Sequence, residues 1–583
     1  MSDGTIITRG GGWLLGEPDA IFTPEDFDDV TRDIAATAKA FVHGEVMPRI
    51  PAMERGELEH NVTLMRAAGA LGLLAAEVPE EFGGLDLSKT VSTVISEEFA
   101  PTGGFAVTQS AHASIGTLPL VYFGTDEQKA RYLPSMASGE RIAAYALTEP
   151  GSGSDALGAK TTAVLDEDGT HYVLNGTKMW ITNAGFADIF TVFVKVDSDK
   201  FTAFIVERDT PGLSFGQEEH KMGIRSSSTR ILNLDDCKVP VDNLLGEIGR
   251  GHKIAFNALN VGRYKLGAAG LGASKRVLHL AAAYAKERHQ FGVPIATFGL
   301  MRHKLAEMAI RTFALESALY RTMGLIDTAI AGRHGAEAVL SGVEEYAVES
   351  SILKVLGSET LDFCVDEGVQ IHGGVGFSAE FEIERAYRDS RVNRIFEGTN
   401  EINRLLIPGT LLKRALKGTL PLIPAATKLQ AELLEPSFDP PADTELAAVA
   451  DLKRLVLLMA GAAAQRFGTK LEQEQEVLAA IADGVINAYA AESALLRARK
   501  IGGELAGTMA RVAIAEAQAK AGTAAAAALP RIAAGDDARI LLSAARRLTK
   551  SEPQDLIELR RQVAEAVLAA DGYPVGLTAP ATA

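Results

Sequence analysis

An acidic residue near position 400 has the surroundings of a general base. Glu397 lies between the aromatic Phe396 and Gly398. A carboxylate beside a bulky apolar side chain loses water, which raises its pKa toward the ~6–7 range that is useful for proton abstraction. The competing interpretation is a surface acid that precedes a helix N-cap at Thr399. This segment therefore predicts a candidate base and leaves both interpretations open.

Three other segments have the composition of a ligand site. Residues 145–155 combine glycines with small hydroxyl side chains, which let a backbone approach a flat or phosphorylated ligand closely. In Lys178–Asn183, Trp180 and the hydroxyl residue Thr182 could cover one face of an aromatic cofactor. Gln370–Gly376 is a glycine cluster at the end of an expected helix. Each segment also has an ordinary interpretation, which is a solvated loop, core packing or a plain helix C-terminus.

The composition argues against several other kinds of site. The formal net charge is −17 and no run of Lys or Arg stands out, so no nucleic-acid surface is expected. Cys237 and Cys364 have no metal-type spacing and fit small buried side chains in a reducing compartment, so no metal site is predicted. Ser152 and Ser154 have no obvious base partner, which disfavours a serine hydrolase.

The elements that must position these segments fall into regions of different periodicity, because 583 residues exceed one ordinary core. Residues 22–142 are helical, with capping signals at Thr23 and Thr125. Residues 143–248 alternate β-branched and aromatic runs with turn signals such as Asn175-Gly176 and Pro211-Gly212, which predicts an antiparallel β domain. The absence of strand–helix alternation disfavours a parallel nucleotide-binding sheet.

The second half of the chain is expected to be helical. Residues 250–415 carry apolar residues at helical spacing in long runs, which predicts a four-helix bundle. Prolines cluster in 416–443, which indicates a linker, and the Ala-rich residues 444–575 predict an additional helical domain. The fold class is therefore mainly α with a central antiparallel β domain.

The N-terminus carries no signal-peptide pattern and no run is long enough to span a membrane. Its acids do not fit a transit peptide either, so a cytoplasmic location is expected and a mitochondrial matrix location is not supported. The apolar helix at Leu452–Ala464, flanked by Arg454 and Arg466, fits a buried core helix better than a peripheral membrane contact.

The order and spacing of these segments resemble the acyl-CoA dehydrogenase family. The motifs are Leu-Thr-Glu-Pro-Gly-Ser-Gly-Ser-Asp, Lys-Met-Trp-Ile-Thr-Asn, Lys-Glu-Arg-His-Gln-Phe-Gly, Gln-Ile-His-Gly-Gly and Phe-Glu-Gly-Thr-Asn, across residues 22–415. The chain looks most like the very-long-chain type, on the residues 244–247, 258–263, 298–301 and 482–489. The resemblance implies the three-domain fold, an added C-terminal helical domain and a homodimer.

The resemblance also implies roles for individual residues. Glu397 would be the catalytic base, and Gly262 stands where some family members carry the base instead, so Glu397 has no rival. The implied FAD-binding residues are Tyr145, Leu147, Thr148, Gly153, Ser154, Trp180, Ile181, Thr182, Arg288, Phe291, Gln370, Ile371, Gly373, Gly374, Thr399, Asn400 and Glu401. Arg288, Phe291 and Gln370–Gly374 would reach the FAD of the partner subunit. The implied substrate-binding residues are Ser154, Asn260, Arg263, Phe396 and Gly398.

The implied reaction is FAD-dependent α,β-dehydrogenation of a fatty acyl-CoA to a trans-2-enoyl-CoA, with electron-transferring flavoprotein as electron acceptor. The main-chain N–H of Glu397 would hydrogen-bond the thioester oxygen. Small residues in Gly103–His112 at the expected pocket floor favour a long acyl chain, although they also suit close helix packing. The alternatives are an acyl-CoA oxidase, which has the same base and flavin, and an assembly or scaffold role in a respiratory complex.

Overall fold

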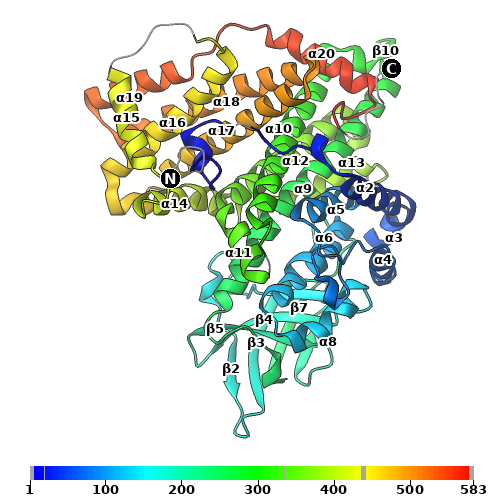
Figure 1. Ribbon diagram of the computed structural model, residues 1–583. Coiled ribbons are helices and arrows are strands. Elements are labelled where there is room, and N and C mark those ends of the chain that lie inside the picture. Colours follow the sequence, from blue (N-terminus) through cyan, green and yellow to red (C-terminus); the bar gives the residue numbers. More distant parts are fainter. Residues whose placement is uncertain (1–5, 19, 334, 435–440, 577–583) are drawn as a thin grey trace.

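The computed structural model describes residues 6–18, 20–333, 335–434 and 441–576. The β sheet lies at one end of the molecule, the long central helices rise from it, and the C-terminal helices lie beside the far part of those helices (Figure 1). Within the described residues, no helix is long and apolar enough to cross a membrane.

The N-terminal region is helical, as predicted. Its α-helices are α2 (Asp29–Phe41), α3 (Ile50–Glu54), α4 (Glu59–Ala70), α5 (Lys89–Phe99), α6 (Gly104–Ser110), α7 (Leu118–Phe123) and α8 (Asp126–Ala137). The predicted capping box at Thr125 is confirmed, because Thr125 and Gln128 exchange side-chain and backbone hydrogen bonds. The Thr23 box is also formed, but it opens only the 3₁₀ turn Pro24–Asp26, and α2 starts after its own cap at Asp28. Local caps thus define the starts of α2 and α8.

The β region forms one sheet of eight strands. They are β1 (Ala143–Ala146), β2 (Thr162–Leu165), β3 (His171–Thr182), β4 (Ile189–Val196), β5 (Lys200–Glu207), β6 (Leu213–Phe215), β7 (Thr229–Pro240) and β8 (Leu244–Leu245). The order is β6-β7-β3-β2-β4-β5-β8, with β1 paired to β4. Most pairs are antiparallel as predicted, but β1 and β2 each pair with β4 in parallel, which the alternation pattern did not predict.

One turn prediction in the sheet is wrong. Asn175-Gly176 lies inside β3 at a shift in register against β7, rather than between two strands. Gly176 has a φ of 151°, and a Cβ there would lie 2.5 Å from the Thr161 hydroxyl oxygen. The glycine therefore serves a close backbone approach at a bulge. The turn at Pro211-Gly212, between β5 and β6, is confirmed.

Long helices form the centre of the molecule. They are α9 (Gly251–Glu287), α10 (Gly299–Ile330), α12 (Ala347–His372) and α14 (Asn400–Leu416), joined by the hairpin β9 (His289–Gln290) and β10 (Val293–Pro294) and by the shorter α11 (Ala336–Glu345) and α13 (Glu382–Ser390). The helix α9 begins at Gly251, at the start of the predicted helical region, and packs along α12. Gly267 and Gly357 allow this close approach, since a Cβ on Gly357 would lie 2.8 Å from the Cα of Gly267.

The C-terminal region is helical, with α15 (Leu422–Leu434), α16 (Thr444–Phe467), α17 (Gln475–Ile501), α18 (Glu504–Ile532), α19 (Gly535–Leu548) and α20 (Leu556–Ala569). The proposed linker 416–443 needs correction, because α15 lies inside it and packs on α16. Pro424 is the third residue of α15, where a missing N–H breaks no helical hydrogen bond. Pro436 and Pro440 lie outside the described residues.

The membrane alternative for Leu452–Ala464 is disfavoured by burial. Leu452, Leu455, Val456 and Met459 on α16 are almost fully buried against neighbouring helices.

The segment before residue 22 packs against the C-terminal helices. Trp13 is 2% exposed, and its ring centroid lies 4.9 Å from that of Tyr489 on α17.

Candidate active site

Glu397 occupies a tight turn immediately before α14. Its φ is +56° and that of Gly398 is +77°, so both residues adopt left-handed backbone conformations. Such a conformation is strained for a non-glycine residue and persists only where its surroundings enforce it. Asn403, fully buried on α14, donates from Nδ2 to the carbonyl oxygens of Gly398 (2.9 Å) and Thr399 (3.1 Å). The first turn of the helix therefore holds the glutamate in place.

The helix α9 faces this carboxylate with a glycine. A Cβ on Gly262 would lie 2.5 Å from Oε2 of Glu397 and 2.8 Å from its Cδ. Oε2 is buried and has no hydrogen-bond partner within the described chain. Gly262 thus provides the space in which a free carboxylate oxygen can stand.

The electrostatic surroundings leave this carboxylate able to take a proton near neutral pH. Burial raises the pKa of Glu397 to about 7, against the opposing charges of Arg263 and Lys354. Lys354 is itself engaged, since its Nζ donates to Asn400 Oδ1 at 2.7 Å. Desolvation is the largest cause of this raised pKa, and carboxyl groups perturbed in this way are candidates for functional groups.

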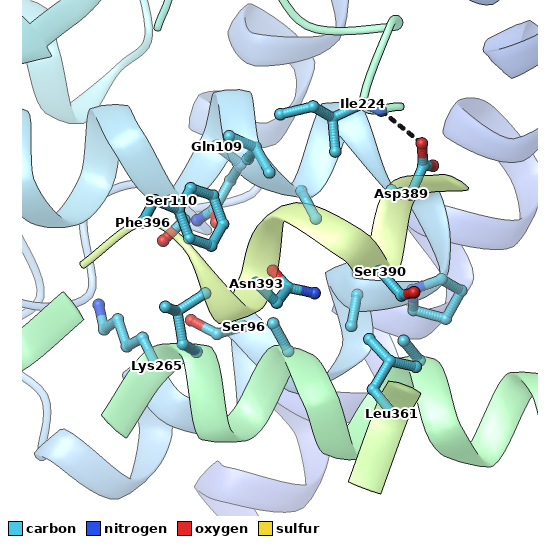
Figure 2. Close-up of a pocket in the computed structure, with 18 of the residues that line it drawn as sticks. Ser96, Gln109, Ser110, Ile224, Lys265, Leu361, Asp389, Ser390, Asn393 and Phe396 are labelled. Atoms are coloured by element: carbon cyan, nitrogen blue, oxygen red, sulfur yellow. Dashed lines mark hydrogen bonds between the residues drawn. The ribbon is translucent and has the colours of Figure 1, made fainter. Parts of the chain in front are cut away.

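A cavity opens in front of Glu397 (Figure 2). The segment that carries Asp389, Ser390, Asn393 and Phe396 crosses over the helix that carries Lys265, and Gln109 and Ser110 lie on the other side of that segment. Glu397, Gly262, Phe396 and Thr182 all line the cavity. The structure therefore brings the predicted base together with residues from four separate parts of the chain.

The predicted pocket floor lies at this cavity in part. Gly103, Ala106, Ser110 and Ala111 line it together with Val107, Gln109 and Ile115. Gly104 does not, because it packs on the segment before β7, where a Cβ would lie 2.4 Å from the Ser226 hydroxyl. His112 is also turned away, because its ring binds Met136 O and the Ala143 N–H.

The sheet contributes aromatic residues beside the base. Tyr145 on β1 is buried, its hydroxyl lies 3.5 Å from the Ala255 carbonyl on α9, and burial followed by the charge of Glu397 raises its pKa well above the usual value. Trp180 on β3 has a φ of +59° at a register shift against β7 and is 53% exposed. Core packing, one interpretation of this tryptophan, is excluded by that exposure. Ile181 beside it is buried, and Thr182 faces the cavity.

The loop after β1 is anchored at Glu149. Its carboxylate accepts hydrogen bonds from the N–H groups of Lys160 and Thr161 and from Lys178 Nζ at 2.7 Å. Leu147 is buried, and Thr148 accepts from the Met179 N–H at 2.9 Å. Gly153 and Ser154 are exposed, and a Cβ on Gly153 would meet nothing within 4 Å. The loop is therefore anchored at Glu149 and exposes the small residues Gly153 and Ser154 to solvent.

Of the residues predicted to bind the acyl-CoA, Phe396 and Gly398 adjoin Glu397 in the chain, and Arg263 is close enough for its charge to lower the pKa of Glu397. Arg263 is 8% exposed, donates to Asn260 Oδ1 at 2.7 Å and leaves its Nε buried without a partner.

Three residues predicted to bind FAD open the helix α14. Thr399 caps this helix by accepting from the Ile402 N–H. Asn400 is buried, with its side chain bonded to Lys354, Ser358 and Glu359, while Glu401 is exposed.

A second group of predicted residues lies at the opposite end of α9. Tyr284 stacks on His372 with ring centroids 4.3 Å apart, and the next turn leads to Arg288 and Phe291. Phe291 is 94% exposed with a φ of +52°. Gln370, Gly373 and Gly374 are exposed while Ile371 is buried, and a Cβ on Gly373 or Gly374 would meet nothing within 4 Å. Gly262 and Tyr284 are 22 residues apart, or roughly 33 Å along the helix, so this group cannot contact Glu397.

The sequence did not predict three features of the site. These are the roles of Asn403 and Lys354 and the contact that requires Gly262 to be a glycine. Asn403 follows Glu397 by six residues, so a buried amide one turn into the following helix was a usable signal. Lys354 is distant in sequence and offered no signal.

Models of protein families match most of the chain. The acyl-CoA dehydrogenase N-terminal domain matches residues 28–140, the middle domain 144–237, and two models described as the C-terminal domain match 249–412 and 451–547.

Individual proteins agree with these matches. A probable acyl-CoA dehydrogenase of Bacillus subtilis is 52% identical over 98% of this chain and 99% of its own length. The human mitochondrial very long-chain specific acyl-CoA dehydrogenase is 41% identical over 59% of this chain, and the match spans 52% of that relative. A crystal structure of an acyl-CoA dehydrogenase complexed with FAD from Bacillus anthracis has a TM-score of 0.95 at 51% identity, over 97% of this chain and 100% of the other.

Proposed function

The chain belongs to the acyl-CoA dehydrogenase family, and from that premise we propose that it oxidises fatty acyl-CoA to trans-2-enoyl-CoA with Glu397 as the base. One observation carries the proposal, namely that Glu397 Oε2 is buried, without a hydrogen-bond partner, and beside a cavity. A buried unpaired carboxylate oxygen is costly, and one that faces a cavity is available to a bound substrate.

The residues beside the base fit an FAD. Trp180 exposes a large aromatic face from a strained backbone, Thr182 lines the cavity, and Tyr145 is close enough to Glu397 for that charge to raise its pKa. We propose that these residues and Leu147, Thr148, Gly153, Ser154 and Ile181 hold the isoalloxazine ring. Thr399, Asn400 and Glu401 open the helix α14, whose N-terminus favours a diphosphate. The flavin, when bound, supplies the acceptor for the hydride from Cβ.

The protein's own contribution is proton abstraction and polarisation. Glu397 would remove the Cα proton, and its raised pKa matches a base that works near neutral pH. Its backbone N–H donates to no acceptor within the described residues, so it is free to bind the thioester oxygen. That hydrogen bond would strengthen as negative charge develops on the oxygen. The acyl chain itself would expel water from the cavity and keep the base dry.

The substrate is proposed to bind along α9. Arg263, with its unpaired buried Nε, and Asn260 would contact the CoA portion, together with Ser154 from the loop after β1. Phe396 and Gly398 would flank the reacting carbons. Small side chains at Gly103, Ala106 and Ala111 support a preference for long acyl chains.

The second group of cofactor residues is proposed to act on another copy of the chain. Arg288 and Phe291 follow the end of α9, and Gln370, Ile371, Gly373 and Gly374 are at the end of α12, where His372 stacks on Tyr284. Tyr284 is roughly 33 Å along α9 from Gly262, so this group is too far away to share one flavin ring with the base. A homodimer would let them cover the FAD of the partner subunit. We propose electron-transferring flavoprotein as the acceptor of the electrons removed from the substrate.

Turnover of a C4 to C20 acyl-CoA panel by the purified protein tests this proposal, with electron-transferring flavoprotein or oxygen as acceptor. We expect a yellow protein that forms trans-2-enoyl-CoA and prefers the flavoprotein. A colourless protein that cannot be reconstituted with FAD, or one that turns over no acyl-CoA, would refute it. Faster turnover with oxygen would identify an oxidase instead.

A further inference from the structure

The acyl cavity follows one face of α9. Leu266, Ala269, Ala273 and Arg276 line it and keep accessible surface, while the intervening residues 270–272 are buried. Their spacing of three or four residues places them on one side of the helix. The cavity thus continues from Gly262 to Arg276 along a stripe of small side chains.

An ion pair stands at the far end of this stripe. Arg276 donates to Glu382 on α13 through two parallel hydrogen bonds, Nε to Oε1 at 3.0 Å and Nη2 to Oε2 at 2.6 Å. Both side chains line the cavity, and they are 23% and 24% exposed, so the pair lies between the cavity and solvent. The parallel fork is the strongest arrangement of this pair.

A second arginine fixes the acid side of the pair. Arg385, one turn along α13, donates from Nη2 to the Pro101 carbonyl at 3.4 Å and lies 3.5 Å from Glu382 Oε1. Its Nη1 lies 3.7 Å from Asp389, whose other carboxylate oxygen accepts the Ile224 N–H (Figure 2). Glu382 is therefore held from two sides, whereas Arg276 is held by Glu382 alone within the described residues.

The distance from the base to the ion pair determines how long an acyl chain the cavity can hold. Gly262 and Arg276 are 14 residues apart, which is about 21 Å along the helix axis. An extended chain with C–C bonds of about 1.5 Å advances about 1.3 Å per carbon. The channel therefore accommodates about 16 carbons beyond the reacting centre.

We propose that the Arg276–Glu382 pair closes the far end of the acyl channel and sets the upper limit of acyl chain length. This inference rests on the proposed function, since it takes the occupant to be an acyl-CoA. A chain longer than the channel must displace the pair before its end can reach solvent. Loss of the charge-assisted fork reduces kcat/KM for such a chain by at least about 10-fold.

The ratio of kcat/KM for C22 to that for C14 acyl-CoA measures the limit. In the double variant Arg276→Ala/Glu382→Ala we expect this ratio to rise at least 10-fold, because the chain end can leave through the opening. The charge-reversed variant Arg276→Glu/Glu382→Arg should restore a low ratio, because the pair forms again. Removal of the exposed fork Arg531–Glu474 on the C-terminal helices, by Arg531→Ala/Glu474→Ala, is the matched control and should leave the ratio unchanged.

A larger side chain inside the channel provides an independent test of the length limit. Ala273 is 11 residues from Gly262, so Ala273→Leu should move the limit down to about 13 carbons. FAD content and melting temperature show whether each variant is folded. An unchanged C22 to C14 ratio in folded, active Arg276→Ala/Glu382→Ala protein would overturn the inference and leave the proposed function intact. Absence of turnover with every chain length would overturn both.

Discussion

The two ends of α9 present opposite kinds of surface. At Gly262 the helix faces Glu397 across a space that would not hold a methyl group, and Asn403 fixes the turn on the other side. At Tyr284 and beyond, Phe291 is 94% exposed, and Gly373 and Gly374 face open space. At Gly262 a glycine is required because Glu397 of the same chain leaves no room for a side chain. At Gly373 and Gly374 no atom of the same chain lies close enough to require a glycine.

The difference shows which part of the proposed machinery a single chain completes. The base, its cradle and the acyl channel are assembled inside one chain, so their geometry is fixed by its own packing. The exposed end carries the proposed cofactor residues, most of them on the surface, and their proposed role requires a partner subunit. Substitutions at the buried end should therefore act on chemistry, and substitutions at the exposed end on cofactor retention and assembly.

The largest effect is expected from removal of the base. Glu397→Gln should lower kcat by about 10³- to 10⁴-fold, because an amide cannot accept the Cα proton. FAD content and thioester binding, measured by absorbance and by titration, should stay within about 2-fold. The exposed Glu167→Gln, in the turn between β2 and β3, is a control of equal chemistry and should retain its turnover. Full activity in Glu397→Gln would contradict the assignment.

A methyl group in the cradle should produce the next largest effect. In Gly262→Ala the new Cβ would stand 2.5 Å from Glu397 Oε2, so the carboxylate must move. A displacement near 1 Å at a reacting group costs about 10² in rate. Gly409→Ala on α14 adds a methyl where nothing lies within 4 Å and should change kcat less than 2-fold. Equal activity in the two variants would show that the cradle has no catalytic role.

The pH dependence should reflect the dry surroundings of the base. Because the pKa of Glu397 is raised to about 7, the ionised, active form grows as pH rises through 7. The rate should increase about 10-fold between pH 6 and pH 8, and level off above, when proton abstraction limits turnover. A profile with its midpoint near pH 4.5 would mean that water hydrates the Glu397 carboxylate and that burial does not raise its pKa.

The smallest effect is expected at the exposed end, and it tests the comparison most directly. Gly374→Leu meets no atom of its own chain, so the fold should be unaffected. If a partner's FAD lies there, affinity for FAD should fall about 5-fold and the dimer should weaken, measured by flavin fluorescence and light scattering. Gly409→Leu, equally exposed on α14, serves as the control. No change in either quantity would mean that this end takes no part in cofactor binding.

The sequence by itself determined the domain plan and the identity of the candidate base. The strand runs, the Thr125 cap and the Pro211-Gly212 turn are local signals, so they survive in the fold. The ordered motifs led to the family and to Glu397. The bulge at Gly176 and the helix α15 were misread, because a glycine or proline in sequence marks a break without stating its geometry.

Only the tertiary structure decided how the base is made active. The space at Gly262 and the charge of Lys354 come from α9 and α12, which meet the turn at Glu397 only when the bundle packs. The same holds for the pair Arg276–Glu382, whose members are more than 100 residues apart in sequence. Desolvation and steric fit depend on what surrounds a residue in space, and sequence neighbours do not specify those surroundings.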